Sequence, residues 1–409
     1  MKLKKNKMSK AKDEDIEVIE QEVSEVVSEI ESEMEEVCIN RSDLVRALLL
    51  AVFSRSHLLI EGEPGTAKTY VVRKFIEHLS PELSRFKILL TKDTVSDAVI
   101  GPVHLGDLRS KSIFRYNTAN MLPEADFAML EEVYRARGTV LDSMLTVLNE
   151  RVFMNAGEEI QCPLCSAFGT TNFVSKDSEG EAFLDRWAIH FKVDALPAEM
   201  RDKLFNIPTR SLEVLTKLTR SHLDKAEKTN IKMPQNVLDF YLELVASLEN
   251  AKSLFSRKIT DRRLVDTVKL IKAEAFMHGR TEVELADVFV ARFGLTLVGD
   301  KQEDAEFSKI YEQLEKKYVN IVKESELTSV DSKLVIEWLA KARAQIDLGP
   351  NDSAGQTRER YKRYYDIGTD LQARLTGYTD LEFTPSTTFK TRRETLLRRV
   401  EDALAKFVF

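Results

Sequence analysis

The stretch that decides the fold runs from an apolar tetrapeptide into a loop of small residues: His57-Leu58-Leu59-Ile60-Glu61-Gly62-Glu63-Pro64-Gly65-Thr66-Ala67-Lys68-Thr69. The tetrapeptide His57–Ile60 predicts a buried strand, and a helical pattern follows Thr69 as far as Leu79. Strand, glycine-containing loop and helix in this order form the context that a phosphate-binding P-loop requires. The sequence therefore predicts a nucleotide site at the N-terminus of the helix.

The residue types of this loop fit the chemistry of phosphate binding. Small residues let successive backbone N–H groups surround the β-phosphate at a helix N-terminus. Lys68 would neutralise phosphate charge, and the Thr69 hydroxyl would coordinate Mg2+. One position departs from the general pattern, because Ala67 stands where the last glycine is usual. We expect all eight residues of Gly62–Thr69 to form the nucleotide site.

A second apolar run, Phe127–Leu130, ends in the carboxylates Glu131 and Glu132. Metal binding and activation of water both need carboxylates near the phosphates. Glu131 would hold Mg2+ through Thr69 or through water, and Glu132 would orient or deprotonate the attacking water. The alternative is a surface pair of glutamates after a buried strand, and the nearby P-loop makes it the weaker interpretation.

Polar and cationic side chains follow further downstream. Asn172 ends another apolar run and could contact the γ-phosphate or the attacking water. Arg186 and the pair Arg262 and Arg263 supply cations that a dissociating phosphoryl group needs. Taken singly, Asn172 also fits a turn and each arginine fits a surface salt bridge.

Short β-rich runs alternate with helical patterns between residues 40 and 195. The clearest strand candidates are His57–Ile60, Lys87–Leu90, Phe127–Leu130 and Ser166–Thr171. Such alternation predicts an α/β fold in which a parallel sheet carries helices on both faces. After Leu196-Pro197 the pattern is helical throughout. Pro234 suits an early turn of a helix over Val237–Leu248, and Thr281–Glu284 predicts a capping box that opens a helix over Leu285–Leu295.

We therefore expect four parts: a flexible basic N-terminus over residues 1–15, an α/β nucleotide-binding domain over 16–195, an all-α domain over 196–300 and a further helical region over 301–409. In the last part, helices are predicted around Lys333–Ile346, Arg358–Leu375 and Arg392–Phe407. Within the second part, Ile16–Val37 predicts an acidic helix with one apolar stripe that includes Val26. This helix either packs on its own domain or docks a partner.

Apolar run length, cysteine content and net charge exclude several classes of protein. The sequence contains no run of the roughly 18 apolar residues that a membrane span needs, so a cytoplasmic protein is expected. Its three cysteines, Cys38, Cys162 and Cys165, cannot form a disulfide framework, and we interpret Cys162 and Cys165 as ordinary buried thiols and not as zinc ligands. The net charge of −7 argues against a broad surface for nucleic acid.

The order of these motifs resembles the MoxR family of AAA+ ATPases and, within it, the RavA-like branch. The resemblance is carried by Gly62–Thr69, Leu130–Val133, Leu148–Arg151, Thr171-Asn172, Leu184–Arg186 and Asp261–Arg263, and it covers residues 20 to 300. Alanine before the P-loop lysine is normal in this family, so Ala67 supports the resemblance. Thr94–Asn120 looks like the family's insertion in the second helix, and Arg151–Ile160 looks like its hairpin.

The resemblance also implies roles for individual residues. Asn172 corresponds to sensor 1, Arg186 to the arginine finger that acts on the ATP of the adjacent subunit, and Arg262 to sensor 2, with Arg263 as a neighbouring alternative. Glu131 departs from the aspartate that the family usually has in the metal-binding position. The region after residue 300 does not visibly match the later domains of RavA.

The function implied by the resemblance is hydrolysis of ATP with Mg2+ between the subunits of a homo-oligomeric, hexameric ring. Such proteins usually remodel or mature a protein client together with a partner that has a von Willebrand factor A domain. Two alternatives remain open: an AAA+ motor acting on DNA or RNA, and an ATP-dependent scaffold with little turnover, which Glu131 suggests.

Overall fold

The computed structural model describes residues 23–174, 178–206, 214, 216–318, 338, 356–377, 394, 397–398, 400–402 and 404–405. The chain divides into two compact units, Met1–Tyr311 and Glu312–Phe409. All the predicted site residues belong to the first unit.

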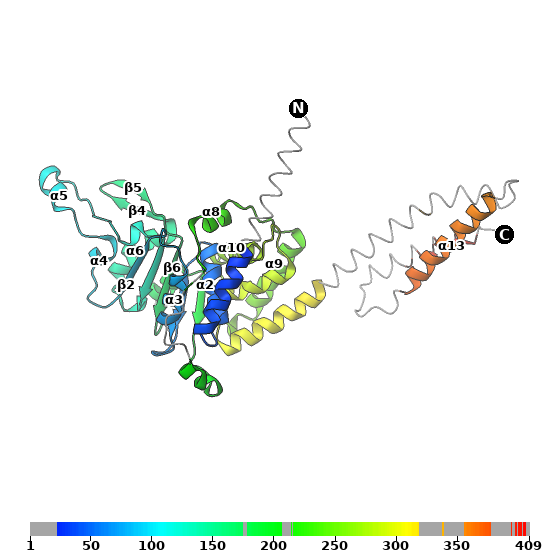
Figure 1. Cartoon of the computed structure of the whole chain (residues 1–409), viewed down its shortest axis with the longest axis horizontal. Helices are drawn as coiled ribbons and strands as arrows, with labels where there is room; N and C mark the ends of the chain where they lie inside the picture. The colour runs from blue at the N-terminus through cyan, green and yellow to red at the C-terminus, as the bar shows by residue number, and fades with distance from the viewer. Residues whose placement is uncertain are drawn as a thin grey trace, which may run out of the picture. The chain divides into compact units, whose positions relative to one another are not determined.

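A five-stranded sheet with the order β2-β3-β6-β1-β7 forms the centre of the first unit (Figure 1). Its strands are β1 (Leu58–Glu61), β2 (Arg85–Leu89), β3 (Phe127–Glu131), β6 (Ser166–Thr171) and β7 (Ile189–Lys192). Every neighbouring pair in this sheet is parallel. The carboxyl ends of the strands therefore lie along one edge of the sheet, and the amino ends lie along the opposite edge.

Helices cover both faces of this sheet, as predicted. The sheet domain contains α2 (Ser42–Phe53), α3 (Lys68–Glu77), α4 (Asp97–Ile100), α5 (Leu105–Lys111), α6 (Gly138–Glu150) and α7 (Ser178–Leu184). Because side chains alternate along a strand, Leu59 and Ala167 lie in a cluster with Met144 of α6, whereas Phe168 faces the other way and contacts Phe75 of α3. The α/β fold class with helices on both faces is confirmed.

The predicted insertion and hairpin are joined to each other. The hairpin consists of β4 (Val152–Asn155) and β5 (Glu158–Gln161), paired antiparallel. In the insertion, Val103 and Tyr116 form an antiparallel bridge. Asn155 accepts a hydrogen bond from the Tyr116 N–H at 2.8 Å and donates one to the Tyr116 carbonyl at 3.1 Å. One buried asparagine side chain thus pairs the insertion with the hairpin.

The acidic N-terminal helix packs on its own domain over the residues described, 23–37. Its buried stripe consists of Val23, Val27, Ile30, Met34 and Val37. Val27 occupies the place predicted for Val26, which is only half-buried, so the stripe is shifted by one residue at this turn. Residues 1–22, including the predicted start of the helix, lie outside the described residues.

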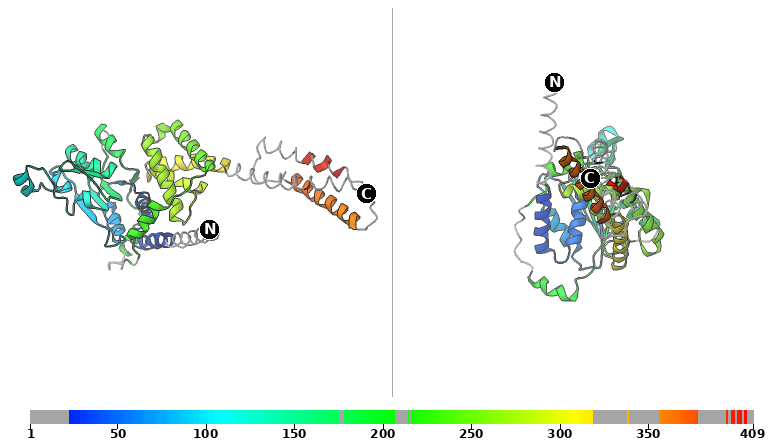
Figure 2. Two further views of the ribbon diagram at one scale, coloured as in Figure 1. Left: turned by 90° about the horizontal axis from the view of Figure 1, so that it is seen from above. Right: turned by 90° about the vertical axis from the view of Figure 1, so that its right-hand side faces the viewer.

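A helical lid follows the sheet domain (Figure 2). α8 (Arg220–Lys228) precedes it, and it contains α9 (Gln235–Asn250), α10 (Asp261–Met277), the 3-10 helix η5 (Leu285–Val290) and α11 (Ala291–Leu295). Arg46 of α2 forms an ion pair with Glu274 of α10 at 2.5 Å, which joins the lid to the sheet domain. Residues 301–318 are helical, and Tyr311 packs edge-on against Phe240 of α9.

The capping box at the end of the lid differs from the prediction. Glu284, and not Thr281, caps the helix, because its side chain accepts from the backbone of Asp287 while the Asp287 carboxylate accepts from the Glu284 N–H at 2.7 Å. The capping box was therefore predicted three residues too early, at Thr281–Glu284, whereas Glu284 and Asp287 form it. A carboxylate at the cap position performs the same function as threonine.

The second unit contains α13 (Gln356–Gly377), which confirms the helix predicted over Arg358–Leu375. Most of the helices predicted around Lys333–Ile346 and Arg392–Phe407 lie outside the described residues. In the part of the chain that the structure describes, no helix has both the length and the apolar character that crossing a membrane requires.

Gly169 of β6 has no room for a side chain, which gives a first prediction. A Cβ atom there would lie 2.6 Å from the ring of the fully buried Trp187. Gly169→Ala is expected to lower the free energy of unfolding by about 1–3 kcal/mol, since overpacking displaces the indole ring. Denaturant unfolding measures this loss, and an equally stable variant would show that Trp187 does not fill this position.

Candidate nucleotide-binding site

The P-loop lies at the carboxyl edge of the sheet, directly after β1. Gly62 passes so close to the next segment that a Cβ atom would lie 2.3 Å from the Val193 carbonyl oxygen. Gly65 has a φ of +84°, which glycine adopts readily. Ala67 also lies in the left-handed region, with a φ of 67°, at a cost of about 1–2 kcal/mol for a residue with a Cβ atom. That conformation explains why glycine is usual there, and it places the loop at the N-terminus of α3.

Lys68 is buried at the first position of α3, and its ammonium group has three acceptors within the chain. It donates to the carbonyl oxygens of Gly62 at 2.5 Å and Glu63 at 2.9 Å, and to Asn172 Oδ1 at 3.0 Å. Burial lowers the pKa of Lys68, while the charges of Glu132 and Glu61 raise it. The half-buried Thr69 follows it in the first turn of α3. A triphosphate bound in this loop would compete with these acceptors for the ammonium group.

Asn172 connects the P-loop lysine to the second glutamate. Its Oδ1 accepts from Lys68, and its Nδ2 donates to Glu132 Oε1 at 2.9 Å. The other oxygen of Glu132 lies 3.1 Å from Arg135 Nε. The structure thus brings together Lys68, Asn172 and Glu132, as a site for hydrolysis needs.

Glu131 lies at the same edge and faces two cations. Its Oε1 is 3.1 Å from Lys87 Nζ and 3.6 Å from Arg73 Nη2. This oxygen is buried and has no hydrogen bond of good geometry in the chain. Mg2+ in nucleotide sites is held by one or two carboxylates together with phosphate oxygens, so Glu131 and the Thr69 hydroxyl fit this cation.

Arg186 and Arg262 lie together elsewhere, in a cavity of about 440 Å3. Ser56 and His57 also line this cavity and directly precede β1, whereas the P-loop directly follows β1. Arg186 comes just before β7, whose first residue, Ile189, pairs with Leu58. Strand residues advance about 3.3 Å each, so the four-residue strand β1 separates the two places by roughly 13 Å. The structure does not bring Arg186 or Arg262 to the P-loop of its own chain.

Arg262 and Arg263 differ in accessibility. The Arg262 side chain is 46% exposed and lines the cavity, whereas that of Arg263 is 5% exposed. Burial lowers the pKa of Arg263, and the charge of Asp185 raises it. Of the two, only Arg262 is therefore placed to reach a ligand outside its own chain.

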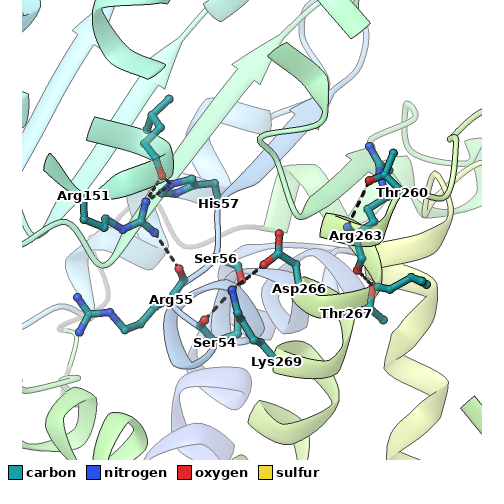
Figure 3. A network of polar contacts seen from close by, with 12 residues as sticks. Ser54, Arg55, Ser56, His57, Arg151, Thr260, Arg263, Asp266, Thr267 and Lys269 are labelled. Carbon is teal, nitrogen blue, oxygen red and sulfur yellow. Dashed lines mark hydrogen bonds and ion pairs between the residues drawn. The ribbon is translucent and has the colours of Figure 1, made fainter. Parts of the chain in front are cut away.

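The cavity is also lined by His57, Asp266 and Lys269, which the sequence did not single out as site residues and which Figure 3 shows in a network of polar contacts. His57 Nδ1 accepts from the Ala167 N–H at 2.9 Å, and His57 Nε2 lies 2.7 Å from the Leu148 carbonyl oxygen. Burial and the nearby Arg151 hold the pKa of His57 well below its usual value. Lys269 of α10 adds a further cation, paired with Asp266 at 2.7 Å. Beside His57, the cavity is lined by residues of the motif Leu148–Arg151, which the sequence analysis had noted. Nothing in the sequence indicated that Lys269 would lie near this motif.

The cysteines are free thiols. Cys38, Cys162 and Cys165 are all buried, and burial raises the pKa of Cys162 and of Cys165 to about 11 each. Cys165 Sγ donates to the Val52 carbonyl oxygen at 3.4 Å. Both thiols of the Cys162–Cys165 pair thus have the character of packed core groups.

Comparisons with known proteins find two matching families and several relatives. Residues 24–232 match the family described as the MoxR domain in the MoxR-vWA-beta-propeller ternary systems, and residues 236–306 match an AAA lid domain. An uncharacterized protein of Methanocaldococcus jannaschii is 26% identical, over 85% of this chain and 87% of that protein. Chaperone MoxR1 of Mycobacterium tuberculosis is 25% identical, over 66% of this chain and 76% of that protein.

A solved structure supports the fold. The crystal structure of a candidate ATPase from Cytophaga hutchinsonii superimposes with a TM-score of 0.56 at 19% sequence identity, over 75% of this chain and 97% of that chain.

Proposed function

Because the chain belongs to the MoxR family of AAA+ ATPases, we propose that it binds ATP at Gly62–Thr69 and hydrolyses it with Mg2+ between the subunits of a ring. The observation that carries this proposal is the hydrogen-bonded connection from Lys68 through Asn172 to Glu132 at the carboxyl edge of the sheet. Within the family we place the chain nearest the RavA-like branch, on the sequence motifs alone.

In the proposed reaction, Lys68, Asn172 and Glu132 each have one role. Lys68 turns from its carbonyl acceptors to the phosphate oxygens and neutralises their charge. Its departure frees Asn172 Oδ1, so the amide can orient the attacking water together with Glu132. Glu132 accepts a proton of that water as the water oxygen bonds to the γ-phosphorus. The bond from the γ-phosphorus to the β,γ-bridging oxygen breaks, and ADP and inorganic phosphate are released. Mg2+, when bound with ATP at Glu131 and Thr69, supplies further neutralisation of phosphate charge.

Arg186 and Arg262 complete the site of a neighbouring subunit. Their distance from the P-loop of their own chain supports action in trans, because charge that develops on the phosphoryl group needs a cation at contact distance. A closed ring lets every subunit both receive and donate these arginines. We propose a hexamer, in line with the resemblance.

We further propose that this ring remodels a protein client together with a partner containing a von Willebrand factor A domain. Support comes from the matched family, whose description places MoxR domains in systems with vWA and beta-propeller proteins, and from the relative named a chaperone. Affinity purification of the Glu132→Gln protein with ATP would capture such a partner. Recovery of nucleic acid in place of protein would favour an AAA+ motor acting on DNA or RNA.

A scaffold with little turnover is the second candidate, because Lys87 and Arg73 compete with Mg2+ for Glu131. Phosphate release with Mg2+ and ATP distinguishes the two. We expect repeated turnover of ATP that depends on Mg2+, and loss of ATP binding in Lys68→Ala. ATP binding without turnover would favour the scaffold, and the absence of binding by the unmodified chain would contradict both functions.

A further inference from the structure

Arg186 lies in a short segment, residues 185–188, that the lid holds at both ends. The segment connects α7 to β7 and carries the buried Trp187, which packs under Gly169. The Arg186 side chain itself turns back to donate to the Ala182 carbonyl oxygen at the end of α7. The position of its guanidinium therefore depends on α7 as well as on the segment that carries the residue.

Asp185 fixes the first end of the segment to the N-terminus of α10. Thr260, the N-cap residue of α10, donates from its hydroxyl to Asp185 Oδ1 at 3.1 Å. Arg263 Nε lies 3.5 Å from the same oxygen, and Arg262 Nη1 lies 3.9 Å from Oδ2. A carboxylate beside the N-terminus of a helix is also favoured by the helix dipole. One carboxylate thus holds the residue before Arg186 against the helix that carries Arg262.

Arg257 fixes the second end. Its guanidinium is buried and donates to the carbonyl oxygens of Trp187 at 2.7 Å and Ala188 at 3.3 Å. The lid loop that carries Arg257 is itself held, because the buried Glu303 accepts from the Ser256 N–H at 2.8 Å. A planar guanidinium can engage two carbonyl groups at once, which a lysine ammonium cannot do with the same geometry.

We propose that Asp185 and Arg257 are positioning residues that join the Arg186 segment to the lid, so that Arg186 and Arg262 approach the neighbouring subunit's triphosphate as one unit. The proposal rests on the proposed function, since it assumes that both arginines act in trans. As long as these contacts hold, Arg186 and Arg262 keep a fixed separation, because Asp185 joins the segment to the helix that carries Arg262. Neither residue touches the nucleotide.

The test uses two variants. Asp185→Asn keeps the size of the side chain and removes its charge. Arg257→Lys keeps the charge but cannot donate to the Trp187 and Ala188 carbonyl oxygens with the same geometry. Each variant is expected to lower kcat for ATP by about 10- to 100-fold, the loss that a misplaced catalytic group causes. KM for ATP should stay within about twofold, because the variant's own P-loop lies at the other edge of the sheet. The matched control is Asp239→Asn on the exposed face of α9, which should keep the kcat of the unmodified chain.

Mixed assemblies separate positioning from damage to the fold. Lys68→Ala subunits bind no ATP but present an intact Arg186 segment, so mixing them with Asp185→Asn should raise ATPase activity above the sum of the separate proteins. The inference would be overturned if the activity of this mixture only equalled the sum of the separate proteins. It would also be overturned if the unmixed Asp185→Asn and Arg257→Lys proteins had the kcat of the unmodified chain. If Arg186→Ala mixed with Lys68→Ala also stays inactive, action in trans fails and the proposed function fails with it.

Discussion

Glu132→Gln is expected to lower kcat for ATP by about 10²- to 10⁴-fold, the contribution of a general base. Glutamine can still accept the hydrogen bond that Asn172 donates to Glu132 Oε1 at 2.9 Å, but it cannot take a proton from water. The nucleotide should bind with nearly unchanged affinity, since Lys68 and the P-loop amides remain. Phosphate release in a single turnover with saturating ATP and Mg2+ measures the loss.

Glu158→Gln is the matched control for that substitution. Glu158 is exposed on β5, so the same chemical change there should leave kcat unaltered. A Glu132→Gln protein that releases phosphate as fast as the control would show that Glu132 is not the base.

Arg186→Ala is expected to have the largest effect, a reduction in kcat of about 10³- to 10⁵-fold, as for removal of an arginine finger. The guanidinium would stabilise charge on the phosphoryl group of the neighbouring subunit. Binding of ATP by the variant's own P-loop should persist, because β1 separates Arg186 from that loop. Equilibrium binding and steady-state turnover, measured on the same preparation, separate the two effects.

The exposed Arg201 provides the control for Arg186. It lies in the 3-10 helix η3 (Ala198–Asn206) and donates to the Leu196 carbonyl oxygen at 3.2 Å. Arg201→Ala should retain normal turnover. If Arg186→Ala lost ATP affinity and turnover in proportion, Arg186 would act in its own subunit or on the fold.

The sheet could be predicted from sequence wherever a strand is an apolar run. Ser166–Thr171 was predicted with the observed bounds, and the strand around residue 88 was misplaced by one or two residues. The strand β7, Ile189–Lys192, was missed because His190 and Lys192 interrupt its apolar residues. It is the last strand of the five-stranded sheet, and its outer side is bridged by Val298.

The nucleotide side of the site could also be predicted, because parallel strands place their carboxyl ends at one edge. Glu132 and Asn172 directly follow the ends of β3 and β6, and Asn172 connects Glu132 to Lys68. The sequence around Arg262 could not predict at which edge of the sheet this residue lies. Its position depends on how the lid packs against the sheet domain.

The contacts of Asp185 and Arg257 could not be predicted from the sequence either. Both are formed across long separations in the chain, between a lid loop and a turn of the sheet domain. An aspartate before an arginine and an arginine in a loop are common on protein surfaces. Only the buried guanidinium and its two carbonyl acceptors distinguish Arg257 from them.

The most direct test of the account is the ATPase activity of Lys68→Ala and Arg186→Ala subunits mixed before ATP is added. Each protein alone should be nearly inactive, the first because it cannot bind ATP and the second because it cannot complete its neighbour's site. The mixture should hydrolyse ATP, since Arg186→Ala subunits keep an intact P-loop and Lys68→Ala subunits keep an intact arginine. A mixture as inactive as its components would contradict a site shared between two subunits.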